Sequence, residues 1–185
     1  MSHQCMVAFL WRRASDPNHL MATIFVASSL SRELKRQTGE MPAIKGTLRR
    51  ATSEDLDAVL ELDRITPVGH ARGPFLTARV QSGEVIVFEH EGGVSGYAVI
   101  RSQSFFGCDF IELLAVAASE RGHGVGSLLL QHAVGLSSTI RIFTSTNRSN
   151  TRMIGVLEKE GWRFSGQLEG IDEGDPELVY YKDAE

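Results

Sequence analysis

The residues with the most evident chemistry form a glycine-rich turn over residues 121–127, with the sequence RGHGVGS. An apolar, strand-like run over residues 110–116 precedes the turn, and an apolar helical segment over residues 126–134 follows it. Glycines allow a backbone to approach a ligand closely, and the start of a helix presents free N–H groups and the positive end of its dipole. The turn therefore predicts a binding site for an anion, in particular for a phosphorylated ligand.

Three glycine patterns compete for this turn. The dinucleotide pattern G-x-G-x-x-G is met by Gly122 and Gly124, but Ser127 takes the third place and no early βαβ unit surrounds it. The phosphate loop of nucleoside triphosphatases needs a Gly-Lys-Ser/Thr ending, which is absent. The pattern Gln/Arg-x-x-Gly-x-Gly/Ala is met in full by Arg121, Gly124 and Gly126. A tight turn without a ligand would explain one or two glycines, but not three that follow an arginine.

The matched pattern resembles the pyrophosphate-binding motif of the GNAT superfamily of acyl-coenzyme A-dependent N-acetyltransferases. The strand LLAV over residues 113–116 resembles the family strand whose backbone pairs with the pantetheine arm of the cofactor. Residues 150–162 resemble the family's Asn-led helix ending in Gly-Phe, and residues 48–56 resemble its first strand and helix. These segments follow the family's order and cover about residues 47–182.

The resemblance implies a binding mode for acetyl-coenzyme A (acetyl-CoA) as co-substrate, without a metal. Backbone amides of residues 122–127 would hold the pyrophosphate and Arg121 would add positive charge. Leu114 and Val116 would hold the pantetheine by strand-like hydrogen bonds. Asn150 would bond the cofactor or orient the neighbouring helix. The expected cofactor-binding residues are Leu114, Ala115, Val116, Arg121, Gly122, His123, Gly124, Val125, Gly126, Ser127 and Asn150.

Acetyl transfer also needs a base, because an alkylamine is almost wholly protonated at neutral pH. Glu112 is the candidate general base, since strict alternation along the strand gives it the same facing as Leu114 and Val116. A carboxylate among apolar neighbours is costly to bury without a partner or a task. The alternative is a glutamate that pairs with an arginine or points to solvent.

No general acid is assigned. Many members of the resembling family place a tyrosine at the position that aligns with Leu157. Tyr180 and Tyr181 would replace it only if the last strand reaches the site, and core or sheet positions are the simpler interpretation. A coenzyme A thiolate is a tolerable leaving group, so a dedicated acid is not required.

The sequence indicates the chemical nature of the acetyl acceptor only through charge. A cluster of acidic side chains precedes the last strand: Glu169, Asp172, Glu173, Asp175 and Glu177. A negative rim would attract a cationic amine, such as a polyamine, an aminoglycoside or a lysine-bearing peptide, whereas the alternative is a solvated acidic loop. We expect His70 and His123 to be surface residues and Trp162 and Phe164 to lie in the core.

The elements that must position these groups follow from periodicity and turn signals. The sequence predicts strands over 47–51, 84–90, 94–102, 110–116, 139–146, 162–166 and 178–182, and helices over 52–62, 75–80, 126–134 and 149–160. Glycines are expected to end the last two helices, at Gly135 and Gly161. The fold expected from this order and from the resemblance is a single α+β (mixed α/β) domain. A central, mixed, mostly antiparallel twisted sheet of about six to seven strands is flanked by about four helices.

Composition excludes several other classes of protein. The chain has 185 residues and a net charge of −4, which does not favour nucleic acid as a partner, and no apolar run is long enough to span a membrane. Cys5 and Cys108 lie far apart and outside metal-ligand spacing, which indicates a reducing, cytoplasmic location without a zinc site. We expect a monomer or a homodimer.

Residues 1–44 form an N-terminal extension of different composition, with apolar patches between basic residues and few acids. One interpretation is an organelle transit peptide; the favoured one is a poorly ordered extension, with translation starting at Met21 or Met41. The domain is therefore expected over residues 45–185.

The predicted function is transfer of an acetyl group from acetyl-CoA to a primary amine of a small molecule or peptide, by direct attack in a ternary complex. A coenzyme A-binding sensor or regulatory module with the same fold is the first alternative. A nucleotide-binding protein is the second, and the glycine spacing and the missing lysine disfavour it.

Overall fold

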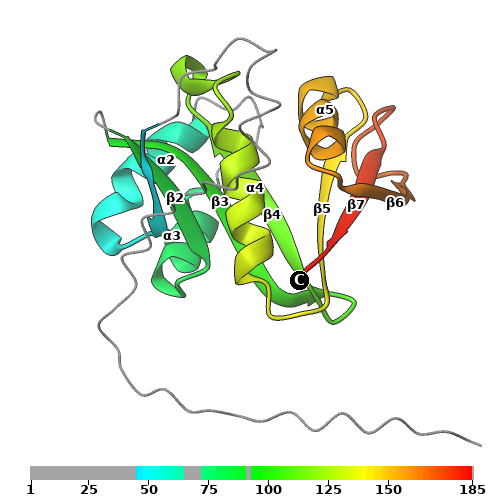
Figure 1. The fold of residues 1–185 in the computed structure, drawn as a ribbon, viewed down its shortest axis with the longest axis horizontal. Helices are drawn as coiled ribbons and strands as arrows, with labels where there is room; N and C mark the ends of the chain where they lie inside the picture. Colours follow the sequence, from blue (N-terminus) through cyan, green and yellow to red (C-terminus); the bar gives the residue numbers. More distant parts are fainter. Residues whose placement is uncertain (1–44, 65–71, 91–92, 185) are drawn as a thin grey trace, which may run out of the picture. The chain divides into compact units, whose positions relative to one another are not determined.

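The computed structural model describes residues 45–64, 72–90 and 93–184 (Figure 1). The N-terminal extension and His70 therefore lie outside the described residues. Within them, seven strands form one sheet in the order β1-β2-β3-β4-β5-β7-β6. Every described pair of neighbouring strands is antiparallel except β4 and β5, which are parallel.

The elements alternate along the chain largely as the sequence predicts. The strands are β1 (Thr47–Arg50), β2 (Val85–His90), β3 (Gly93–Phe105), β4 (Cys108–Val116), β5 (Arg141–Asn147), β6 (Arg163–Leu168) and β7 (Glu177–Asp183). The helices are α2 (Leu56–Arg64), α3 (Gly73–Gln81), α4 (Val125–Leu136) and α5 (Thr151–Lys159), with short 3-10 turns η1 (Ser53–Asp55) and η2 (Ala118–Glu120). The predicted mostly antiparallel sheet with about four helices is confirmed.

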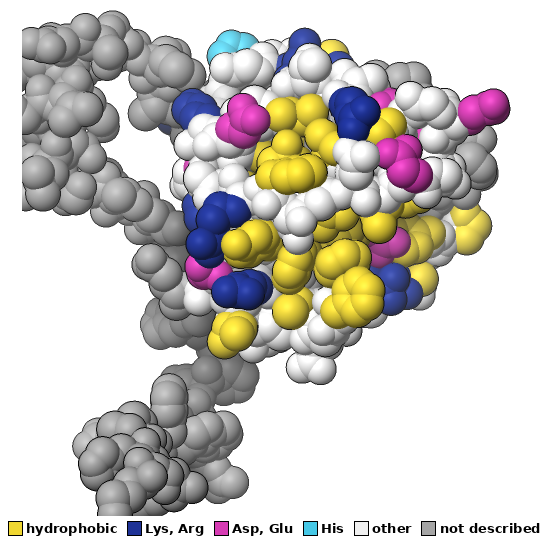
Figure 2. Space-filling model, turned by 90° about the vertical axis from the view of Figure 1, so that its right-hand side faces the viewer, with side chains coloured by type: hydrophobic (Ala, Val, Ile, Leu, Met, Phe, Trp, Pro, Cys, Tyr) yellow, Lys and Arg dark blue, Asp and Glu magenta, His cyan; other side chains and the backbone are white. Residues whose placement is uncertain are grey.

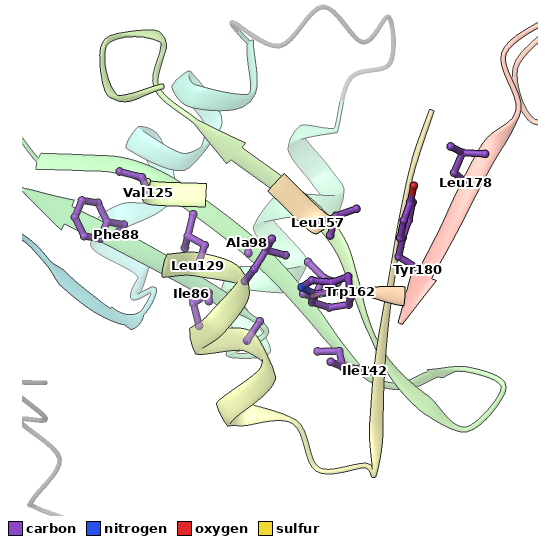
Figure 3. Packing of buried hydrophobic residues seen from close by; sticks show 13 residues of the cluster. Ile86, Phe88, Ala98, Val125, Leu129, Ile142, Leu157, Trp162, Leu178 and Tyr180 are labelled. Carbon is purple, nitrogen blue, oxygen red and sulfur yellow. The ribbon is translucent and has the colours of Figure 1, made fainter. Parts of the chain in front are cut away.

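Helices cover both faces of the sheet, so its central strands are buried on both sides. On one face, Leu129 of α4 and Leu157 of α5 belong to the cluster that also holds Ile86 and Trp162 (Figure 3). On the other face, α2 and α3 contribute a second cluster around Tyr97 of β3. We call these the α4–α5 face and the α2–α3 face.

The α2–α3 face is apolar beyond the area that its helices cover. Hydrophobic side chains gather on the side of the domain that carries β6 and β7 (Figure 2). A shallow groove of about 350 Å³ is lined there by Phe105, Phe106, Cys108, Phe143, Ser165, Gly166, Gln167, Leu168 and Val179.

Two local predictions are wrong. Gly135 lies inside α4, which continues to Leu136 and ends where Ser137 turns back to bond the carbonyl of Val134. Phe164 is 55% exposed, whereas Trp162 is buried as expected. β6 is the edge strand of the sheet, and the ring of Phe164 lies edge-on to that of Tyr180, 5.6 Å away.

Candidate functional site

Strands β4 and β5 separate partway along their length. They are paired at only three rungs, the last of which joins Ile111 to Thr144. Beyond it, β4 continues to Val116 and β5 to Asn147 without pairing to each other, while β4 stays paired with β3 up to Val116. We call this opening, between residues 112–116 of β4 and 145–147 of β5, the fork.

Glu112 is the extra residue of a β-bulge at the base of the fork. The register of β3 and β4 shifts there, because Ile111 lies opposite Ile100 and Leu113 lies opposite Val99. A bulge breaks strict alternation, and consequently both Ile111 and Leu114 pack toward the α4–α5 face.

The facing predicted for Glu112 is therefore wrong. Its carboxylate lies 3.2 Å from the guanidinium of Arg101 and its side chain is 34% exposed. Ile100 packs toward the α4–α5 face, so its neighbour Arg101 projects from the α2–α3 face and brings Glu112 there. Glu112 is thus paired with an arginine and located where the two strands part.

The glycine-rich turn lies beside the β4 arm of the fork. Gly122 and Gly124 have φ angles of 85° and 93°, in the left-handed region that favours glycine. Gly124 is the N-cap of α4 and supplies no side-chain cap, so the first-turn amides of residues 125–127 have no partner within the helix. A methyl group on Gly126 would lie 3.9 Å from Leu114, which places this amide-rich turn against β4.

Arg121 fixes the turn to the end of β4, because its Nε donates to the carbonyl oxygen of Val116 at 3.1 Å. His123 is exposed, as expected. Asn150 lies at the start of α5 on the other side of the fork. Its Oδ1 accepts the N–H of Met153 at 3.2 Å and its Nδ2 donates to Thr146 Oγ1 at 3.1 Å. Asn150 thus caps α5 through Oδ1 and ties it to β5 through Nδ2.

The residue at position 157 and the three tyrosines of the chain lie in different surroundings. Leu157 is fully buried, and Tyr180 lies in the same core cluster, where burial raises the pKa of its phenol. Tyr181 lies beneath the guanidinium groups of Arg163 and Arg141. Tyr97, the third tyrosine, donates its hydroxyl to Asp63 at 2.8 Å under α2.

The acidic connection between β6 and β7 borders the open end of the fork. Asp172 accepts a hydrogen bond from Asn147 at 2.7 Å, and Asp175 accepts the N–H and hydroxyl of Ser149. Hydrogen bonds from Ser149 are the main reason that the pKa of Asp175 lies below its ordinary value. These two carboxylates therefore fasten the connection to the end of β5, so only part of the acidic cluster remains for an acceptor.

The described residues contain neither a metal site nor a membrane-spanning helix. No group of three or more His, Cys, Asp or Glu side chains is placed to hold a metal ion there. None of the helices in that part of the chain has the length and apolar character needed to cross a membrane.

Taken together, these observations define an α+β protein whose mostly antiparallel sheet opens into a fork beside an uncapped helix start. The model of the acetyltransferase (GNAT) family matches residues 52–162, more than half of the chain. The chain belongs to this family.

Known proteins agree with this assignment. An acetyltransferase of the GNAT family from Bacillus cereus superposes with a TM-score of 0.70 at 31% identity, covering 75% of this chain and 97% of that one. The structure of yncA from Salmonella typhimurium, solved with its cofactor acetyl-CoA, gives a TM-score of 0.62 at 19% identity, covering 76% and 95%.

Among curated proteins, the peptidyl-lysine N-acetyltransferase YjaB of Salmonella typhimurium is 31% identical over 68 residues. The match covers 37% of this chain and 46% of YjaB, so the chain spans about half the length of this relative.

Proposed function

We propose that the protein is an N-acetyltransferase that transfers the acetyl group of acetyl-CoA directly to a primary amine. The observation that carries this proposal is the fork with the uncapped start of α4 beside it. One arm offers unpaired backbone along β4, and the helix start offers amides without partners. A long ligand with an anionic end and an amide-containing arm matches both features.

In this proposal acetyl-CoA, the acetyl donor, lies along β4. Amides of residues 122–127 hold the pyrophosphate, with the helix dipole and Arg121 adding positive potential. The backbone of residues 114–116 bonds the pantetheine as a strand would, which leads the thioester toward Glu112 at the base of the fork. Because Arg121 already donates from Nε to Val116, its terminal nitrogens are the ones that face the phosphates.

Glu112 is the proposed general base. It lies on the α2–α3 face, so the amine approaches the fork from that side. The carboxylate takes a proton from the ammonium group, directly or through a water molecule, and the neutral amine attacks the thioester carbon. Collapse of the tetrahedral intermediate breaks the C–S bond and releases the coenzyme A thiolate. The extra proton on the nitrogen passes to the thiolate or to water, and Glu112 returns its proton to solvent, so no protein acid is needed. Arg101 holds the carboxylate in place.

The acceptor is a primary amine of a small molecule or of a peptide. The peptidyl-lysine activity in the name of YjaB makes lysine-bearing peptides the first candidates to test. We further propose a cytoplasmic monomer or homodimer that acts without a metal.

A coenzyme A-binding sensor is the second candidate function. One observation favours it: the buried Leu157 stands at the position where many relatives have the tyrosine that acts as the acid. A sensor would bind coenzyme A without turnover.

The test combines calorimetry with coenzyme A and thiol release from acetyl-CoA over a panel of amines, including lysine peptides and polyamines. We expect micromolar coenzyme A binding and turnover with at least one amine. Glu112→Gln should lower kcat/KM by about 100-fold, a typical loss for a general base, while coenzyme A affinity is kept. Glu89→Gln is the matched control, because Glu89 is also a partly exposed strand glutamate paired with an arginine.

Each outcome has a distinct meaning. Folded protein without affinity for coenzyme A would overturn the function itself. Binding without turnover over the whole panel would establish the sensor. Full activity of Glu112→Gln would remove Glu112 from the mechanism and leave the transferase assignment in place.

A further inference from the structure

The buried row of β5 changes from apolar to hydroxyl-bearing side chains toward the fork. Ile142, Thr144 and Thr146 alternate along the strand, and they are 0%, 2% and 7% exposed. A buried hydroxyl is costly unless it is hydrogen bonded, and valine would fill the same space without that cost. The two threonines therefore call for a specific explanation.

Both hydroxyls have partners, on opposite sides of β5. Thr146 accepts from Asn150 and so ties β5 to the start of α5. Thr144 donates to the carbonyl oxygen of Ile111 on β4 at 3.0 Å, in a fully buried contact. Ile111 and Thr144 form the last rung of the parallel ladder, and the next residue of β4 is the bulged Glu112. Thr144 thus adds a side-chain bond at the point where the two strands part.

We propose that Thr144 is a positioning residue that fixes the base of the fork and, through it, the orientation of Glu112 and of the β4 backbone. The inference rests on the proposed acetyl transfer. Without this hydroxyl, the carbonyl of Ile111 loses a buried donor and the last rung is free to shift. A displacement of a fraction of an ångström at Glu112 changes the alignment of base, amine and thioester, to which reaction rates are highly sensitive.

The pyrophosphate site lies at the other end of β4, so coenzyme A affinity should be largely independent of Thr144. Thr144→Val, which keeps the shape and removes the hydroxyl, should lower kcat by about 10-fold or more, with KM for acetyl-CoA and Kd for coenzyme A within about 2-fold. Thr144→Ser, which restores the donor, should recover most of kcat. Thr77→Val is the control, because Thr77 also donates to a backbone carbonyl, that of Gly73, within α3.

A wild-type kcat in Thr144→Val would overturn the proposal. So would a Thr144→Ser enzyme as impaired as the valine variant, since size and not the donor would then matter. If Thr144→Val does not fold, Thr144→Cys takes its place, because a thiol is only a weak donor and should give the same loss of kcat.

Hydrogen exchange supplies a readout that does not depend on turnover. With coenzyme A bound, amides over residues 111–114 should exchange faster in Thr144→Val than in wild type or Thr77→Val. Unchanged exchange would contradict the positioning role. A wild type that binds coenzyme A but acetylates no amine would defeat the proposed function, while this exchange comparison would still decide the role of Thr144.

Discussion

The two ends of the β4–β5 pair are built in opposite ways. At the closed end, where β4 and β5 begin, polar groups are satisfied within the protein and aromatic rings are packed together. At the open end, backbone groups lack strand partners and glycines replace side chains. The same two strands therefore hold the domain together at one end and offer binding groups at the other.

Asp109 dominates the closed end. Its carboxylate is almost fully buried and has no cation beside it among the described residues, yet it accepts the N–H groups of Gln103 and Ser138 at 2.9 and 2.7 Å. The hydroxyls of Ser102, Ser137 and Ser138 complete its shell. One side chain thus joins the β3–β4 hairpin to the segment that leads from α4 into β5.

Aromatic packing extends this closed end across four strands. The rings of Phe105 and Phe110 stack at 5.1 Å, Phe105 also lies 5.1 Å from Phe143, and Phe143 lies 5.7 Å from Tyr181. Such ring contacts stabilise the fold beyond what the burial of each ring contributes. Because the two ends differ in this way, we expect mutations at the closed end to change stability and mutations at the open end to change ligand binding.

The largest expected effect is at the open end. Gly124→Glu should reduce coenzyme A affinity at least about 100-fold, because it places bulk and negative charge at the helix start that we propose as the phosphate site. Gly124 also needs a positive φ, so part of the damage will be a loss of stability from strain. Calorimetry measures the affinity, and urea unfolding measures the strain.

Gly161→Glu separates these two contributions. Gly161 has a φ of 74°, ends α5 and has open space around it, so the variant carries similar strain and the same added charge away from the fork. We expect a comparable loss of stability with unchanged coenzyme A affinity. Equal losses of affinity in both variants would mean that the glycine-rich turn is not the phosphate site.

The sequence was sufficient to predict the order of elements and the turn, since glycine spacing and apolar periodicity are local signals. The bulge at Glu112 could not be predicted, because residues 110–116 are apolar toward both faces and give no sign of a break in alternation. The role of Asp109 was also missed, because Ser137 and Ser138, which donate hydrogen bonds to its carboxylate, lie nearly 30 positions away in the sequence. The capping role of Asn150 could have been predicted from the sequence, because asparagine before a helix is a common N-cap.

The next largest effect is on stability at the closed end. Asp109→Asn should cost about 2–3 kcal/mol of unfolding free energy, because an amide keeps one acceptor oxygen and turns an NH₂ toward existing donors. Coenzyme A affinity should stay within about 2-fold, since the phosphate turn is at the other end of the strand. Asp175→Asn, which changes a partly buried carboxylate at the open end, is the control and should cost much less. If denaturant unfolding shows the same loss of unfolding free energy in Asp109→Asn and Asp175→Asn, the division between the two ends is contradicted.

The same carboxylate predicts how stability depends on pH. Burial alone would raise the pKa of Asp109, but hydrogen bonds from Gln103, Ser138 and Ser137 outweigh it and hold the pKa below its ordinary value of 3.8. The unfolded chain therefore binds this proton more readily than the folded one. The stabilisation is present above pH 3.8 and is lost as the pH falls from there through the lower, folded pKa. Asp109→Asn should flatten this acid limb, and an unchanged limb would remove Asp109 as its source.

The smallest effect tests how closely α4 is seated on the sheet. Gly96 of β3 lies under the first turn of α4, and a methyl group there would come within 3.0 Å of Val125, 3.1 Å of Leu129 and 3.2 Å of the Ala115 carbonyl oxygen. Gly96→Ala must push this turn outward by a few tenths of an ångström. We expect a loss of about 1 kcal/mol of stability from overpacking. Coenzyme A affinity should fall about 3- to 10-fold, because the amides proposed to bind the phosphates move with the helix.

Gly135→Ala adds the same methyl group to the last turn of α4, where no atom lies within 4 Å. It should raise stability by about 0.5–1 kcal/mol through helix propensity and leave affinity unchanged. A matching loss of affinity in both variants would show that the helix responds as a rigid unit, and the two ends of the β4–β5 pair would then be coupled through α4.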